Sequence, residues 1–288
     1  MTERTPAWYD EQYNNRGRIP EHPAILQRWA DTSAAALAAL GPLELAYGDD
    51  ATERLDLFAP AAGASGAASA PVLIYFHGGY WRALGKRDQS FVAPPFVDAG
   101  TLVVLPDYAL CPAVSIEHIV GQMQRAVAWV YRHASAYGGD PARIVVAGHS
   151  AGGHLAAMML ASDWPQVAPD LPAGLVRTAL AISGVFDLEP LRRAPFLAPD
   201  LRLDAGTARR LSPASLTAPA GRLAAVVGAN ESEEFLRQNE LIRAAWGPAV
   251  VDVCEALPGH HHMSIIGDLG DAGSRLHAIC RRCLGLAG

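Results

Sequence analysis

The sequence contains few cysteines, no excess of basic residues and no long apolar segment. Only Cys280 and Cys283, two of the four cysteines in 288 residues, have the CxxC spacing of a metal-binding or redox pair. No second pair accompanies them, so we expect free thiols rather than a disulfide framework or a zinc site. The formal net charge is −6, and lysine and arginine form no repeating basic stripe. That pattern argues against a nucleic-acid partner.

The sequence also shows neither the apolar run of a membrane-spanning helix nor the opening residues of a secretory signal. No apolar run reaches the roughly 20 residues that a membrane-spanning helix requires. The first ten residues are polar and of mixed charge, unlike a secretory signal. We therefore expect a cytoplasmic protein without a membrane partner, which acts on a small molecule; the sequence also allows a homodimer.

Half of the residues are hydrophobic, which is enough for a large core. Short apolar runs alternate with longer segments of helical period, a pattern typical of a mostly parallel sheet flanked by helices. Residues 1–288 are therefore predicted to form one α/β domain. Strands are expected at 72–76, 102–105, 144–147, 178–182, 223–227 and 250–254, helices at 116–136, 151–161, 233–246 and 271–284, and an antiparallel entry hairpin at 43–47 and 54–58.

Three segments do not follow this alternation. Residues 59–70 are rich in Ala, Gly and Ser and are interpreted as a surface loop. Residues 1–40 and 186–219 read as additions to the core fold. Additions of this kind commonly lie over the C-terminal ends of the strands, where ligands bind, so we expect them to form a small cap.

The segment Gly148-His149-Ser150-Ala151-Gly152 lies between an apolar strand and a helix-like run. This is the setting of a GxSxG nucleophile elbow, in which a strained turn presents the serine at the end of the sheet. The pattern predicts Ser150 as a nucleophile and an α/β-hydrolase fold. It also places the N–H of Ala151 at a helix N-terminus, where it can stabilise an oxyanion.

A second glycine pair follows the expected strand 72–76, in the run His77-Gly78-Gly79-Tyr80-Trp81. Loops of this HGG type supply backbone N–H groups to the oxyanion. We expect Gly78 and Gly79 to complete the oxyanion hole with Ala151. His77 is interpreted as a structural residue.

A serine nucleophile needs a base, and the base needs an acid that orients it. In this fold the acid and then the histidine follow the serine along the chain. Glu231, just after the expected strand 223–227, is the predicted acid, and Asp187 is the alternative. Glu233 and Glu234 fall in the first turn of the next helix.

The base belongs to a run of three histidines, His260, His261 and His262, after the last expected strand. Adjacent side chains diverge, so a metal site is not expected, nor is any cofactor. The spacing from Pro258-Gly259 favours His262 as the base. Participation of His260 or His261 stays open at this point.

The motifs together resemble the kynurenine formamidase (arylformamidase) family, within the hormone-sensitive-lipase-like group of α/β hydrolases. The resemblance runs from Tyr13 to Ile266. It rests on the runs EQYNNRGRIPEH, HGGYW, DYALCP, GGDPARIVVAGHSAGGHLAA and SGVFDLEPL, and on an acid segment that is similar to Asp-Ser-x-Glu-Phe-x-Arg-Gln. Two positions depart from the family pattern: Glu231 stands where the family has Asp, and Met263 where it has Phe.

The resemblance implies hydrolysis of an aryl formamide such as N-formylkynurenine, with Ser150, Glu231 and His262 as the triad. The first alternative is a carboxylesterase or amidase for other small acyl substrates. The second is a binding protein that has lost catalysis, which is disfavoured because all three triad residues are present. The expected substrate pocket is formed by Tyr80, Trp81, His149, Phe186 and Met263. Arg192 and Arg193 could bind a substrate carboxylate, but we interpret them as part of an exposed cap surface.

Overall fold

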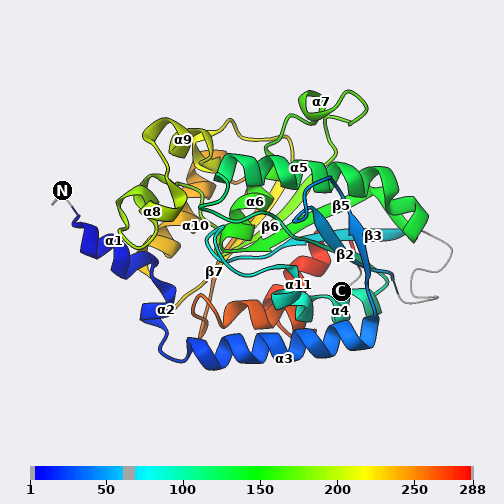
Figure 1. Ribbon diagram of the computed structural model, residues 1–288, viewed down its shortest axis with the longest axis horizontal. Coiled ribbons are helices and arrows are strands. Elements are labelled where there is room, and N and C mark those ends of the chain that lie inside the picture. Colours follow the sequence, from blue (N-terminus) through cyan, green and yellow to red (C-terminus); the bar gives the residue numbers. More distant parts are fainter. Residues whose placement is uncertain (1–3, 61–68, 287–288) are drawn as a thin grey trace.

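A computed structural model describes residues 4–60 and 69–286 and contains an eight-stranded sheet (Figure 1). The strand order is β1-β2-β4-β3-β5-β6-β7-β8; β1 and β2 run antiparallel to their neighbours, and all other pairs are parallel. The strands are β1 (Leu43–Ala46), β2 (Arg54–Phe58), β3 (Ala70–Phe76), β4 (Leu102–Pro106), β5 (Gly139–His149), β6 (Thr178–Ile182), β7 (Arg222–Gly228) and β8 (Val253–Leu257). This is the α/β-hydrolase architecture that the sequence predicts.

Helices cover both faces of this sheet, which is why its central strands are apolar almost throughout. All seven residues of β3 are buried. On one face, α5 (Ile116–His133), α6 (Ala151–Leu160) and α10 (Glu233–Trp246) share a hydrophobic cluster with the sheet. On the other face, α3 (His22–Leu40), α4 (Pro94–Asp98) and α11 (Arg275–Cys283) contribute to a second cluster, and Figure 1 shows these two layers.

The remaining helical segments are short. They are α1 (Pro6–Tyr13), α2 (Asn15–Arg18), α7 (Trp164–Val167), α8 (Ala198–Leu201) and α9 (Ala205–Arg210), with 3-10 turns η1 (Lys86–Val92), η2 (Ala134–Tyr137), η3 (Glu189–Arg193), η4 (Pro213–Ser215) and η5 (Ile265–Gly270). Among residues 4–60 and 69–286, no helix combines the length and the apolar character that crossing a bilayer requires.

The sequence predicts every strand, but the last one lies three residues later than expected, at 253–257 instead of 250–254. The backbone N–H groups of Val250 and Val251 bond to the carbonyl of Gly247 at 3.2 and 2.9 Å, so a turn occupies the start of the apolar run. The edge strand β8 is only partly buried, and its apolar pattern is correspondingly weak. Most of the predicted loop 59–70 falls outside the described residues, and its last residue already belongs to β3.

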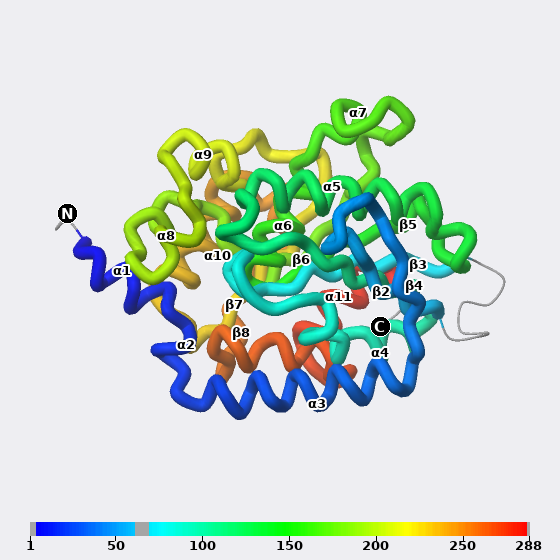
Figure 2. Tube along the Cα trace, viewed as in Figure 1, coloured from blue at the N-terminus to red at the C-terminus, as the bar shows by residue number. Residues whose placement is uncertain are grey.

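The expected cap is formed by α1 and α2 together with the segment that contains η3, α8 and α9, which lie side by side at one end of the molecule (Figure 2). A hydrogen bond of 3.1 Å from the Phe196 N–H to Asp10 Oδ1 joins the two parts. The helix α3 differs from the expectation for residues 1–40, because it runs along the flank of the sheet and packs its Trp29 against Phe91 of η1. Only its first half lies near the cap.

The close packing of the start of α6 against the end of β3 depends on Gly152. A Cβ atom at this position would lie 2.0 Å from the carbonyl oxygen of Phe76 at the end of β3. Glycine is therefore required for the helix to approach the sheet this closely. Gly121, in the middle of α5, has no such restriction, since the nearest atom to an added Cβ there is Arg125 Nη1 at 3.6 Å.

The two glycines make opposite predictions for stability. Gly152→Ala should lower the free energy of unfolding by about 3 kcal/mol or more, because the new methyl group meets backbone that cannot move aside. Gly121→Ala should raise it by about 1 kcal/mol through helix propensity. Urea unfolding followed by circular dichroism measures both; a Gly152→Ala protein as stable as the parent would contradict the packing described here.

Candidate active site

Ser150 lies at the turn between β5 and α6 and is 3% exposed. Its backbone has φ 57° and ψ −117°, a strained conformation for a residue with a side chain. A hydrogen bond of 2.8 Å from its N–H to the carbonyl of Ile182 at the end of β6 holds the turn. The next residue, Ala151, begins α6, so the serine stands at the positive end of a helix.

The structure brings His262 and Glu231 together, 31 residues apart in sequence, at the ends of neighbouring strands β7 and β8. His262 Nδ1 lies 2.6 Å from Glu231 Oε2. Because the carboxylate accepts the Nδ1–H, the imidazole has its other nitrogen, Nε2, free as an acceptor. His262 and Ser150 line the same cavity.

The carboxylate of Glu231 is held by two further donors. Its Oε1 accepts the hydroxyl of Ser183 at 2.5 Å and the N–H of Gly228 at 2.8 Å. Ser183 is a functional candidate that the sequence reasoning did not single out, although it begins the SGVFDLEPL run. Its φ of 50° at the tip of β6 turns the chain there.

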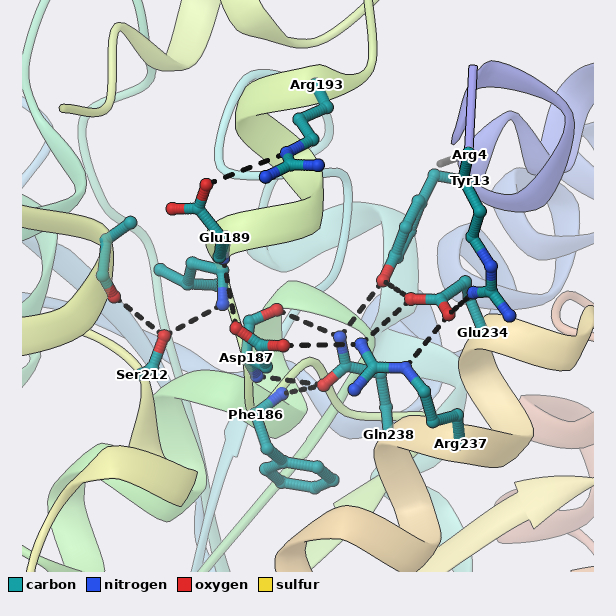
Figure 3. Close-up of polar contacts among 12 residues, drawn as sticks. Arg4, Tyr13, Phe186, Asp187, Glu189, Arg193, Ser212, Glu234, Arg237 and Gln238 are labelled. Carbon is teal, nitrogen blue, oxygen red and sulfur yellow. Dashed lines mark hydrogen bonds and ion pairs between the residues drawn. The ribbon is translucent and has the colours of Figure 1, made fainter. Parts of the chain in front are cut away.

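The alternative acid, Asp187, belongs to a different network. Its Oδ2 lies 3.3 Å from Arg237 Nη2, and Arg237 also binds Glu234 through two hydrogen bonds. Figure 3 shows this cluster between the cap and α10, with Tyr13 and Gln238 at its centre. Within the part of the chain that the structure describes, no contact joins Asp187 to His262, so the geometry does not favour it as the acid.

The loop after β3 passes directly beside the serine. An added Cβ on Gly78 would lie 3.3 Å from Ser150 Cβ, so this residue is adjacent to Ser150. Gly79 has φ 103°, and a Cβ there would lie 2.1 Å from the carbonyl oxygen of Ala83. His77 has the structural setting expected of it, since its ring stacks on Tyr108 at 4.1 Å.

His149 directly precedes Ser150, and its ring lies beside that of His262. Its Nε2 is 2.8 Å from the backbone carbonyl of His262, and the two rings are 4.7 Å apart. Burial lowers the pKa of His149 well below its usual value, and the nearby His262 lowers it further. The neutral ring therefore donates from Nε2 to the backbone carbonyl of His262 and holds it in place.

The cavity at Ser150 has a volume of about 350 Å³. Three of the five expected pocket residues line it: Tyr80, His149 and Met263. Trp81 and Phe186 do not, because both are fully buried in the core. The sequence reasoning missed a larger set of wall residues from the cap, α3 and the loop after Gly79, namely Asn14, Asn15, Arg16, Leu26, Trp29, Arg82, Ala83, Leu84, Gln89, Phe196 and Asp200.

Trp81 and Phe186 are core residues for different reasons. Trp81 packs edge-on against His154, with ring centroids 4.9 Å apart. Phe186 folds back over Gly184, where an added Cβ would lie 2.6 Å from its ring. Arg192 and Arg193 both pair with Glu189 and lie outside the cavity, so the carboxylate role weighed for them has no support.

The other two histidines of the run have separate partners. His260 Nε2 lies 3.1 Å from Asp268, and His261 Nε2 lies 3.3 Å from Glu21 at the start of α3. Across residues 4–60 and 69–286, no group of three or more His, Cys, Asp or Glu side chains is arranged to hold a metal ion. All four cysteines are free thiols.

Comparisons with known proteins agree with this architecture. Residues 55–168 match the BD-FAE family model. The kynurenine formamidase of Danio rerio is 32% identical over 275 residues, which cover 93% of this chain and 89% of the relative, and that of Salmo salar is 29% identical over 98% and 94%. The esterase LipQ of Mycobacterium tuberculosis is 37% identical over a shorter stretch, 41% of this chain and 29% of the esterase.

Solved structures place the fold in the same group. A candidate thioesterase from Silicibacter sp. TM1040 superposes with a TM-score of 0.80 at 32% identity, over 94% of this chain and 97% of that one. The carboxylesterase EstE1, from a metagenomic library, has a TM-score of 0.66 at 19% identity, over 92% and 98%, which is similarity of fold alone. The chain belongs to the kynurenine formamidase family of α/β hydrolases, and it is a hydrolase of amide or ester bonds.

Proposed function

We propose that this hydrolase cleaves an aryl formamide such as N-formylkynurenine to formate and the free amine, with Ser150, His262 and Glu231 as its catalytic triad. The observation that carries the proposal is the shared cavity of Ser150 and His262, with Glu231 2.6 Å from the far nitrogen of the imidazole. Relatives named kynurenine formamidase over nearly the whole chain support the choice of substrate.

In the acylation step, Ser150 Oγ attacks the formyl carbon while His262 Nε2 accepts the hydroxyl proton. The negative charge that develops on the carbonyl oxygen is held by the N–H groups of Gly78, Gly79 and Ala151. When the C–N bond breaks, His262 returns the proton to the leaving amine. Glu231 accepts the Nδ1–H of His262 throughout and stabilises the imidazolium.

In the second step, water attacks the formyl ester on Ser150, and His262 takes the proton from the water. The C–O bond to the serine then breaks, His262 gives that proton to Ser150 Oγ, and the formic acid that leaves ionises to formate. A formyl group needs little room on the acyl side. Most of the 350 Å³ cavity is thus available to the leaving amine, and selectivity depends on that part of the substrate.

A carboxylesterase is the second candidate, because the esterase LipQ and the BD-FAE family model match the region of the nucleophile. The same triad serves both reactions. The ratio of kcat/KM for an aryl formamide and for a p-nitrophenyl acyl ester separates them.

Ser150→Ala should reduce turnover of the formamide by about 10⁶-fold, since no other group can form the acyl-enzyme. The fold should be preserved, because the smaller side chain needs no extra space. Steady-state rates and the melting temperature measure the two effects. More than a trace of activity in a homogeneous Ser150→Ala protein would rule out the serine route.

The acid is tested by a matched pair of amide substitutions. Glu231→Gln should lower kcat by up to about 10⁴-fold, because the amide disturbs the tautomer and charge of His262. Asp187→Asn should have a much smaller effect, since its contacts are with Arg237 and not with the base. The reverse ranking of the two kcat values would transfer the acid role to Asp187.

The three histidines should differ sharply in one assay at saturating formamide. His262→Ala should be almost inactive, because the serine proton then has no acceptor. His260→Ala and His261→Ala should keep most of kcat, since their partners are Asp268 and Glu21. An inactive His261→Ala beside an active His262→Ala would mean that the base has been assigned to the wrong residue.

A further inference from the structure

Three charged side chains line the cavity at Ser150: Arg16, Arg82 and Asp200. Two of them neutralise each other, because Arg82 forms an ion pair with Asp200 and also donates to the carbonyl of Phe196 at 2.7 Å. Arg16 has no hydrogen-bond or ion-pair partner anywhere in residues 4–60 and 69–286. Arg16 is therefore the charged side chain of this cavity wall that no carboxylate of the described residues pairs with.

The backbone beneath Arg16 is anchored. Tyr13, three residues before it, is buried, and its hydroxyl donates to Glu234 at 2.7 Å and accepts from Gln238 at 3.0 Å (Figure 3). The carbonyl of Tyr13 accepts the Tyr80 hydroxyl at 2.6 Å, which joins this segment to the cavity wall. Asn14 Oδ1 then caps α2 by accepting the Gly17 N–H at 3.1 Å. Arg16 is thus presented from a fixed position at the cavity.

The rest of the wall suits a flat apolar group. Leu26, Trp29 and Met263 contribute apolar surface. Tyr80 and Phe196 meet edge to face, with ring centroids 6.0 Å apart. An aromatic ring against these side chains and a negative charge near Arg16 would satisfy both features of the cavity.

We propose that Arg16 is a specificity-determining residue that binds a carboxylate on the leaving amine, so that the enzyme selects aryl formamides that carry a carboxylate over those that carry none. This inference rests on the proposed function, since it concerns the substrate of the same site. A guanidinium group matches a carboxylate with two parallel hydrogen bonds. Arg16 is exposed to solvent, so the gain is smaller than in a dry site and should fall with salt.

The test compares a formamide that carries a carboxylate with a smaller one that carries no charge. The anionic probe is an ortho-formamidophenyl ketone whose alkyl chain ends in a carboxylate, and the neutral probe is ortho-formamidoacetophenone. Arg16→Gln should lower kcat/KM for the anionic probe by roughly tenfold, as expected for one partly exposed charge-assisted pair, and change the neutral probe by less than about twofold. Arg16→Lys should restore part of the preference.

Arg18→Gln is the matched control. Arg18 ends the same short helix, is exposed, and has only a 3.5 Å hydrogen bond to the carbonyl of Glu11. It does not line the cavity at Ser150 but a neighbouring one that His262 also lines, so it controls for a nearby positive charge, and its substitution should leave the ratio of the two kcat/KM values unchanged. An equal loss on both probes in Arg16→Gln, or the same change of ratio in Arg18→Gln, would overturn the assignment.

A binding measurement separates this inference from the proposed reaction. The product amines of the two probes are titrated into Ser150→Ala and into Ser150→Ala/Arg16→Gln by calorimetry. The anionic amine should bind the first protein roughly tenfold more tightly than the second, and the neutral amine should bind both alike. Wild-type protein that binds the amines in this way but cleaves neither formamide would refute the proposed reaction alone. Equal affinities of the anionic amine for both proteins would refute the role of Arg16.

Discussion

The close approach of α6 to the end of β3 is the constraint on which the site depends. Gly152 permits it, since an added Cβ would overlap the carbonyl of Phe76. The same approach forces Ser150 into a strained turn and brings the loop with Gly78 against the serine. Gly78 and Ser150, which are 72 residues apart in sequence, are thereby held in contact. Strain of this kind persists only where surrounding packing fixes it, and the fully buried strand β3 provides that packing.

The cap is attached to this rigid centre through buried polar contacts. Burial and the nearby Glu234 raise the pKa of Tyr13 well above its usual value, so its hydroxyl stays protonated and donates. Burial alone would raise the pKa of Glu234, but hydrogen bonds from Arg237 and Tyr13 outweigh it and lower that pKa. A neutral phenol and an ionised carboxylate are therefore matched as donor and acceptor. Since α10 begins two residues after Glu231, this contact joins the cap to the segment that carries Glu231.

The sequence predicts those parts of the fold and the site that are encoded by short, continuous segments. The strand before Ser150 and the helix after it are read from apolar patterns, and the elbow, the HGG loop and the order of Glu231 and His262 follow from short motifs. The wall of the cavity is different, because Arg16, Trp29 and Asp200 belong to the separate helices α2, α3 and α8 and meet only in three dimensions. Trp81 and Phe186 are the opposite case, because the sequence predicts them in the pocket and the structure places them outside it. Both stand next to site motifs, yet the backbone turns them into the core, where burial of a large aromatic side chain is favourable.

The central claim is that the reaction passes through one acylated serine that faces the cavity. Active-site-directed labelling with a fluorophosphonate, followed by peptide mapping in a mass spectrometer, tests it most directly. The account predicts one label per chain on the peptide that contains Ser150, and protection of that peptide when an aryl formamide is present in excess. Labelling of a different residue, or full turnover of the formamide by protein whose Ser150 is completely labelled, would contradict it.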